Sequence, residues 1–301
     1  MRAGTEVTGL PGAAVVQVER RVANQLYDCA ERLPRFENRD FYLSSTQERV
    51  RSEIRESSRE SLDWLIGEIR ARLLRPPYTA LVRGLSFDCG NRLFVAINRS
   101  FGEMVALPYK EPRAQLVHYI QPSTDLPSPR GGLESERLHT DTTDWASPID
   151  YISMTCVRPD PGGGGRTKLM DIDSIRDEVC KHLGQDAILS LGTISVPWRL
   201  SDSFGGGIKW RPVLSESQIC WRRYTIDQAM EALQTKLADE TISLLDSFEQ
   251  LITRSTRAIE FLMGEGDFLI SNNLKTIHAR TTISGGQLSD RLMIRGWVTT
   301  Q

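Results

Sequence analysis

Apolar positions along the chain recur at two spacings, which separate predicted helices from predicted strands. Between residues 48 and 75, apolar residues return every three or four positions, as on one face of a helix; they are Leu62, Leu65, Ile66, Ile69 and Leu73. Pro76 and Pro77 end this segment, because proline lacks the amide hydrogen that a helix needs. Helices are also predicted at 14–32, 91–105, 173–183 and 227–256.

Short runs rich in β-branched and aromatic residues predict strands between these helices. They cover residues 78–87, 115–122, 149–161, 162–172 (a glycine turn followed by a strand), 192–198 and 217–226, with two or three more between 266 and 298. Residues 199–216 contain Gly205–Gly207, and we expect them to form a mobile loop that closes over a site as a lid. Strands outnumber helices in the second half and are short. This pattern favours a mixed α/β fold with a mainly β core, a jelly roll (double-stranded β-helix) flanked by helices.

The chain shows no internal repeat and no linker, so we expect a single domain over residues 1–301. Residues 1–77 would form a helical extension packed on the core. Residues 78–301 would form the jelly roll with a helical insert.

Composition and charge limit the kinds of partner that the chain can have. Of 301 residues, 40% are hydrophobic, which is enough for a core, and the net charge of −2 gives no electrostatic basis for binding nucleic acid or an anionic membrane. Five cysteines without a C-x-x-C pair suit a reducing compartment. Residues 1–21 do not read as a signal peptide, and no apolar run approaches the ~18 residues of a membrane span. We therefore expect a soluble cytoplasmic protein.

The segment "RLHTDTTDW" (137–145) contains a candidate metal site. In an extended segment, His139 and Asp141 point to the same side, and imidazole and carboxylate are both metal ligands. The alternative is a turn in which Asp141 accepts a hydrogen bond from a backbone amide. A third ligand is available in His278, within the apolar-flanked segment "NNLKTIHARTTI". Two histidines and one carboxylate leave three coordination positions open, as in non-heme Fe(II) oxygenases.

The last predicted strand carries two arginines on one face. Arg291 follows His278 by thirteen residues, and Arg295 lies four residues further on, so their Cα atoms are roughly 13 Å apart along the strand. The planar guanidinium of arginine binds carboxylates in a bidentate manner, so the two could serve different anions. Thr167, after the turn Gly162–Gly165, could add a hydroxyl. The alternatives are an ion pair between Arg291 and Asp290 and a packing role for Thr167.

Four segments together resemble the Fe(II)/2-oxoglutarate-dependent dioxygenases of the taurine dioxygenase and clavaminate synthase-like group. They are "HTD" (139–141), "GGRTKLMD" (164–171), "GDFLISNNLKTIHAR" (266–280) and "DRLMIRGWV" (290–298). Their order and intervals match that family over about residues 78–301. The clavaminate synthase branch usually has glutamate where Asp141 stands. Halogenating members lack this carboxylate, so its presence argues against halogenation.

The resemblance implies a role for each of these residues. His139, Asp141 and His278 would bind Fe(II), and Thr167 and Arg291 would bind the distal carboxylate of 2-oxoglutarate. Arg295 would bind an acidic group of the substrate. O₂ would be the second cosubstrate, and the reaction would hydroxylate an unactivated C–H bond and release succinate and CO₂.

Two further substrate contacts are predicted. They are Trp145, just after the metal motif, and Asp227, whose alternative role is to cap the helix that follows. The substrate would be an amino acid or an amino-acid-derived natural-product intermediate, either free or tethered to a carrier.

Three alternatives to hydroxylation remain open at the level of sequence. The same residues could support desaturation or cyclisation of the substrate. A zinc hydrolase could use the same three ligands, but it would need a general-base glutamate and would have no use for Arg291. A non-catalytic jelly-roll binding protein would be expected to have lost a ligand, and none is missing.

Overall fold

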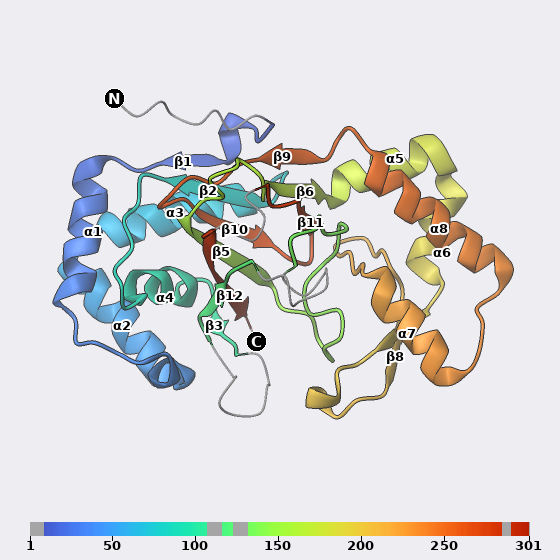
Figure 1. The fold of residues 1–301 in the computed structure, drawn as a ribbon, viewed down its shortest axis with the longest axis horizontal. Helices are drawn as coiled ribbons and strands as arrows, with labels where there is room; N and C mark the ends of the chain where they lie inside the picture. The colour runs from blue at the N-terminus through green and yellow to red at the C-terminus, as the bar shows by residue number, and fades with distance from the viewer. Residues whose placement is uncertain (1–8, 107–115, 123–131, 285–289, 301) are drawn as a thin grey trace.

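Two β-sheets face each other at the centre of the protein, and helices cover the outer side of each (Figure 1). The computed structural model describes residues 9–106, 116–122, 132–284 and 290–300. Along the horizontal axis of Figure 1 the N-terminal helices, the sheets and the C-terminal helices follow one another. This layered arrangement has the mixed α/β composition and the central jelly roll predicted from the sequence.

The larger sheet has seven strands, and the smaller one has three. The large sheet runs in the order β1 (Val15–Gln17), β2 (Thr79–Arg83), β10 (Phe268–Asn272), β5 (Tyr151–Arg158), β12 (Leu292–Thr299) and β3 (Glu103–Met104), and β4 (His118–Ile120) also pairs with β12. The small sheet runs β11 (Thr276–Arg280), β6 (Thr167–Asp171) and β9 (Ile259–Phe261). All these pairs are antiparallel except β1 with β2.

Two groups of four helices enclose the sheets. The first group is α1 (Arg20–Arg32), α2 (Ser44–Ser57), α3 (Ser61–Leu73) and α4 (Arg92–Arg99). The second is α5 (Ile172–Leu183), α6 (Gln185–Thr193), α7 (Arg223–Leu233) and α8 (Asp239–Arg254). A hairpin of β7 (Val196–Arg199) and β8 (Ile208–Arg211) packs beside α7, and short 3₁₀ turns lie at Gly12–Ala14, Asn38–Tyr42 and Asp202–Phe204.

Alternation along the strands explains why the large sheet is buried on both faces. On β10, Phe268 and Ile270 pack against the first helix group, while Leu269 packs between the two sheets. On β6, Leu169 faces the same inter-sheet core, while Met170 packs against the second helix group. Successive side chains of a strand point to opposite sides, so each sheet contributes to two apolar layers.

Four predicted helices differ from those in the structure. The helix predicted at 91–105 is α4, which ends at Arg99, and Glu103–Met104 form β3. The helix predicted at 48–75 is two helices, because the chain turns at Ser58–Glu60 and Arg59 adopts a φ of 55°. The one predicted at 227–256 is likewise split into α7 and α8, and α7 begins at Arg223, within a segment predicted to be a strand. The segment predicted as a helix from residue 14 begins as β1, where β-branched Val15 and Val16 pair with β2.

The segment 199–216, predicted as a loop, contains ordered structure. It continues β7 and forms β8, with the pairing Val196–Arg211 through Arg199–Ile208, and Gly205–Gly207 supply three residues of positive φ in the connecting turn. Glycine adopts positive φ without a steric penalty, so these residues make the turn rather than a long flexible loop. Whether the hairpin acts as a lid stays a prediction.

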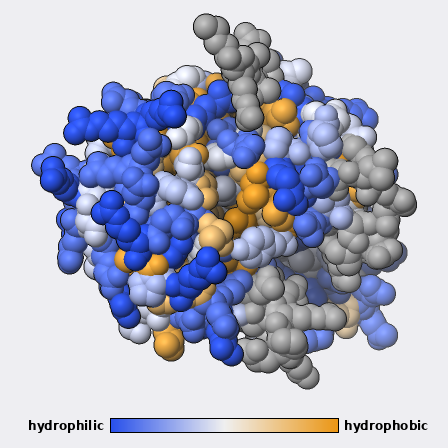
Figure 2. Space-filling model, turned by 60° about the vertical axis from the view of Figure 1, so that its left-hand side comes forward, coloured by the Kyte–Doolittle hydropathy of each residue, from blue (hydrophilic) through white to orange (hydrophobic). Residues whose placement is uncertain are grey.

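Polar side chains cover most of the face shown in Figure 2, and apolar ones appear there mainly in a narrow central band. Within the described ranges, no helix is long and apolar enough to cross a membrane.

Candidate metal centre

His139, Asp141 and His278 converge between the two sheets. His278 lies in the middle of β11, and His139 pairs with it in a short antiparallel bridge: each residue's backbone N–H donates to the other's carbonyl, at 2.9 and 2.8 Å. This bridge brings the two imidazole rings to a centroid separation of 4.8 Å. The predicted H-x-D motif and the distant second histidine are thus joined by backbone pairing.

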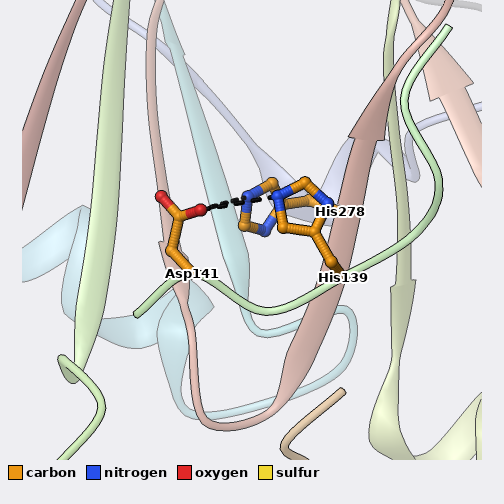
Figure 3. A group of neighbouring side chains, drawn as sticks. All are labelled: His139, Asp141 and His278. Atoms are coloured by element: carbon orange, nitrogen blue, oxygen red, sulfur yellow. Dashed lines mark ion pairs between the residues drawn. The ribbon is translucent and has the colours of Figure 1, made fainter. Parts of the chain in front are cut away.

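The three side chains present their donor atoms to one small space (Figure 3). The Oδ1 atom of Asp141 lies 3.5 Å from Nε2 of His139 and 3.7 Å from Nε2 of His278. Nδ1 of His139 is 2.7 Å from the carbonyl oxygen of Arg137, so this nitrogen carries the proton and Nε2 keeps its lone pair. A backbone acceptor on the second nitrogen is the usual way in which proteins orient a metal-binding histidine.

Burial and neighbouring charges keep Asp141 and His278 in the forms that bind a metal. Burial alone would raise the pKa of Asp141, but Arg295 and the two histidines hold it well below the usual range. Burial lowers the pKa of His278, which favours the neutral imidazole. A carboxylate and neutral imidazoles are the forms that coordinate metals. Two nitrogens and one oxygen, largely buried and within 4.8 Å of one another, therefore fit a divalent transition metal.

Asn273 fixes the backbone of the ligand Asp141. Its side-chain oxygen accepts from the amide of Asp141 at 2.9 Å, and its nitrogen donates to the carbonyls of Asp141 and Ile149, each at 3.1 Å. Asn273 is fully buried in the turn between β10 and β11, five residues before His278. The turn that leads to His278 therefore also holds the backbone of Asp141.

We expect Asn273→Ala to destabilise the fold by about 3 kcal/mol, because it leaves several buried backbone groups without partners. Urea denaturation of the apo-protein measures this. Asn272→Ala is the matched control in the same turn: its side chain accepts one bond, from the amide of Leu274, and its loss should cost about 1 kcal/mol. Equal losses for the two variants would contradict this account.

Arg280, two residues after His278 on β11, secures the segment that precedes His139. Its guanidinium donates to the carbonyls of Gly132 and Glu134 at 2.7 and 2.9 Å and lies 3.5 Å from the carboxylate of Glu136. These contacts hold residues 132–136 against β11, so His139 enters the site from a fixed direction.

Arg291 is buried beside the glycine turn that precedes β6. Its side chain is against Gly165, which has a φ of +64°, and a Cβ atom on that glycine would lie 2.8 Å from Nε of Arg291. Asp160 shapes the turn: its carboxylate accepts from the amides of Gly164 and Ser284, at 3.0 and 2.7 Å. Burial lowers the pKa of Arg291 to about 10, so it is a cation at neutral pH.

Thr167 lies on the same face of the small sheet as His278. In the register of β6 with β11, Leu169 pairs with His278 and Thr167 with Arg280. Paired residues of antiparallel strands share a face, and two residues along a strand span roughly 7 Å. Thr167 therefore lies roughly 7 Å along the sheet from the pair formed by Leu169 and the ligand His278.

Arg295 and Trp145 both contact Trp297, and Arg295 also lies next to the ligand Asp141. Nη1 of Arg295 is 3.4 Å from Oδ2 of Asp141, and its guanidinium carbon is 4.5 Å from the ring centre of Trp297. Trp145 packs edge-on against the same Trp297 ring, with centroids 5.6 Å apart. These two predicted substrate contacts thus meet at one tryptophan, two residues after Arg295 on β12.

Asp227 lies in the second turn of α7, not at its N-cap, which is Arg222. Its half-exposed carboxylate forms an ion pair with Arg223 at 2.8 Å. No contact joins it to the three ligands among the described residues, and its role in substrate binding stays a prediction.

Comparison with known proteins adds family and fold to this geometry. The model of the taurine catabolism dioxygenase TauD, TfdA family matches residues 53–297. No curated protein sequence matches the chain. Among solved structures, the non-heme iron oxygenase OrfP in complex with Fe and α-ketoglutaric acid has a TM-score of 0.71 at 16% identity, covering 95% of this chain and 94% of that one. An asparagine oxygenase in complex with Fe(II), 2S,3S-3-hydroxyasparagine and succinate has a TM-score of 0.65 at 16% identity, with the same coverage.

The structural neighbours share the fold, and the family match spans most of the chain, including all three metal-binding candidates and both arginines of the last strand. The zinc hydrolase and the non-catalytic binding protein are thereby set aside. The chain belongs to the taurine catabolism dioxygenase TauD/TfdA family, and it is a 2-oxoglutarate-dependent non-heme iron dioxygenase.

Proposed function

We propose that this enzyme hydroxylates an unactivated C–H bond of an amino acid or a small amino-acid-derived compound, and that it releases succinate and CO₂. The observation that carries the proposal is the largely buried group of His139, Asp141 and His278, with one carboxylate oxygen facing both Nε2 atoms. Amino acids as substrates are supported by the neighbours, whose structures hold hydroxyasparagine and hydroxyarginine products.

In this proposal His139, Asp141 and His278 hold the iron, and Arg291 and Thr167 hold the distal carboxylate of 2-oxoglutarate. Arg291 suits this task because it is a buried cation whose side chain is fixed by the glycine turn. Thr167 adds a hydroxyl donor on the sheet face that carries His278. The iron supplies O₂ activation coupled to decarboxylation of the cosubstrate. The protein positions both partners and excludes water from the space between the sheets.

For the substrate, the proposal assigns its acidic group to Arg295 and one wall of its pocket to Trp145. Arg295 directs Nη1 toward Asp141, and its Nη2 makes no hydrogen bond among the described residues, so a donor remains for a ligand. An arginine next to the metal would place the substrate's carbon skeleton against the reacting centre.

The test is a screen of amino acids and their amide-linked or carrier-tethered derivatives with Fe(II), 2-oxoglutarate and O₂. We expect succinate to form in proportion to a product that has gained one oxygen atom, as seen by mass spectrometry. A product that has lost two hydrogens instead would indicate desaturation or cyclisation. Succinate formation that no amino-acid-like compound stimulates would contradict the substrate proposal.

Gly165→Ala should weaken 2-oxoglutarate binding by displacing Arg291. The new methyl group would lie 2.8 Å from Nε of Arg291, a contact that forces the guanidinium to move. Gly163→Ala is the matched control, because Gly163 also has a positive φ, of +75°, but faces open space. Both variants incur backbone strain of about 1–2 kcal/mol, so similar stabilities are expected. An anaerobic titration with 2-oxoglutarate should show weaker binding for Gly165→Ala alone, and equal affinities would argue against this placement of the cosubstrate.

A further inference from the structure

The two oxygens of the Asp141 carboxylate have different surroundings. Oδ1 faces the histidine nitrogens, at 3.5 and 3.7 Å. Oδ2 accepts a hydrogen bond of 2.8 Å from the indole Nε1 of Trp297 and lies 3.4 Å from Nη1 of Arg295. One oxygen is thus directed to the metal site, while the other is held from the opposite side by two donors.

Trp297 is itself fixed in position. The residue is 5% exposed. Its ring centroid lies 5.2 Å from that of His118 and 5.6 Å from that of Trp145. Indole has a single N–H donor and no acceptor, so its bond to Oδ2 has one possible direction. A hydrogen bond to a buried carboxylate is also stronger than one between neutral groups. The bond therefore fixes the rotation of the Asp141 carboxylate.

We propose that Trp297 is a positioning residue: with Arg295, its indole N–H holds Oδ2 so that Asp141 binds the iron through Oδ1 alone. The inference rests on the proposed function. It assigns a role to Trp297, which the proposed function leaves unused. Its importance follows from counting coordination positions. Three protein donors on an octahedral ion leave three positions, which the chelating end of 2-oxoglutarate and O₂ together need. A carboxylate free to rotate could bind with both oxygens and occupy one of them.

The alternative is that Trp297 only packs, since it belongs to an apolar cluster with Ile149 and Ile152. Two substitutions separate the roles. Trp297→Phe keeps an aromatic ring in the cluster and removes the N–H. Trp297→His loses much of the ring but keeps a five-membered ring with a nitrogen at the place of the indole nitrogen, able to donate in the neutral form. A positioning role predicts that histidine is the better replacement, whereas a packing role predicts that phenylalanine is.

The experiment measures binding rather than turnover. Each Fe(II)-loaded protein is titrated anaerobically with 2-oxoglutarate at pH 8, and the visible charge-transfer absorption of the chelate is followed; Fe(II) affinity is measured separately. We expect Trp297→Phe to bind Fe(II) but to need at least about tenfold more 2-oxoglutarate than wild type, which is the loss typical of residues that orient metal ligands. Trp297→His should recover most of the affinity for 2-oxoglutarate. Trp198→Phe, which loses a buried indole bond of 3.1 Å to the carbonyl of Arg211, should behave as wild type.

Each outcome decides between the roles. Wild-type affinity in Trp297→Phe, or weaker binding in Trp297→His than in Trp297→Phe, would overturn the inference. If Trp297→Phe does not fold, Trp297→His still decides: affinity within about threefold of wild type supports positioning, and a loss of about tenfold contradicts it. A wild-type protein that gives no absorption band would instead show that the proposed function is wrong. A normal wild-type band with an unaffected Trp297→Phe variant would overturn the positioning role alone.

Discussion

Replacing His278 with alanine is expected to abolish stoichiometric Fe(II) binding and, with it, all succinate formation. The substitution removes one of three protein donors and leaves Asp141 facing a single imidazole. The loss in Fe(II) affinity should exceed about 100-fold, since removing even an outer partner of a metal ligand costs 10- to 100-fold. Equilibrium dialysis with Fe(II) under anaerobic conditions measures the change directly.

His182→Ala is the appropriate control for this variant. His182 is exposed in the last turn of α5 and takes no part in the cluster. The His182→Ala variant should bind one equivalent of Fe(II) with wild-type affinity. If His278→Ala also retained wild-type affinity, the assignment of the metal site would be wrong.

Replacing Arg291 with methionine should raise the dissociation constant of 2-oxoglutarate by roughly 30-fold or more, because truncating one partner of a buried charge pair costs about 2–5 kcal/mol. Methionine keeps much of the side-chain volume beside Gly165 and removes only the cation. Fe(II) affinity should stay unchanged, because Arg291 makes no contact with the three ligands among the described residues. Calorimetric titration of the anaerobic Fe(II) protein tests both statements.

Arg257→Met provides a matched loss of charge on the surface, where Arg257 pairs with Asp177 at 2.9 Å. Exposed ion pairs contribute roughly 0–1 kcal/mol to stability, so this variant should bind 2-oxoglutarate as wild type does. Weakened Fe(II) binding in Arg291→Met, with 2-oxoglutarate affinity intact, would place Arg291 in the metal site instead.

The metal-binding candidates could be predicted from the sequence because their chemistry is local and distinctive. The short motif around His139 carries two kinds of metal ligand at a spacing of two, and His278 lies in an apolar-flanked segment that reads as a strand. The face of each strand that enters the shared core is not visible in the sequence, because β10 carries Phe268, Leu269 and Ile270 in a row and β6 carries Leu169 next to Met170.

The residues that support the ligands could not be predicted in this way. Asn273 reads as an ordinary turn residue, and only the tertiary structure brings its side chain to the backbone of Asp141. Trp297 reads as one of several apolar residues on a strand, and its bond to Oδ2 depends on how β12 packs beside the ligand loop. The breaks at Arg59 and before α8 were missed for a related reason, because helical spacing continues across a turn when both helices pack on the same core.

The most direct test of the central claim is an anaerobic titration of the apo-protein with Fe(II) and 2-oxoglutarate, followed by visible absorption. The account predicts a weak charge-transfer band that saturates at one equivalent of each. The band should be absent in His278→Ala and should require far more 2-oxoglutarate in Arg291→Met. A wild-type protein that binds Fe(II) without developing the band, or develops it equally in the Arg291 variant, would contradict the account.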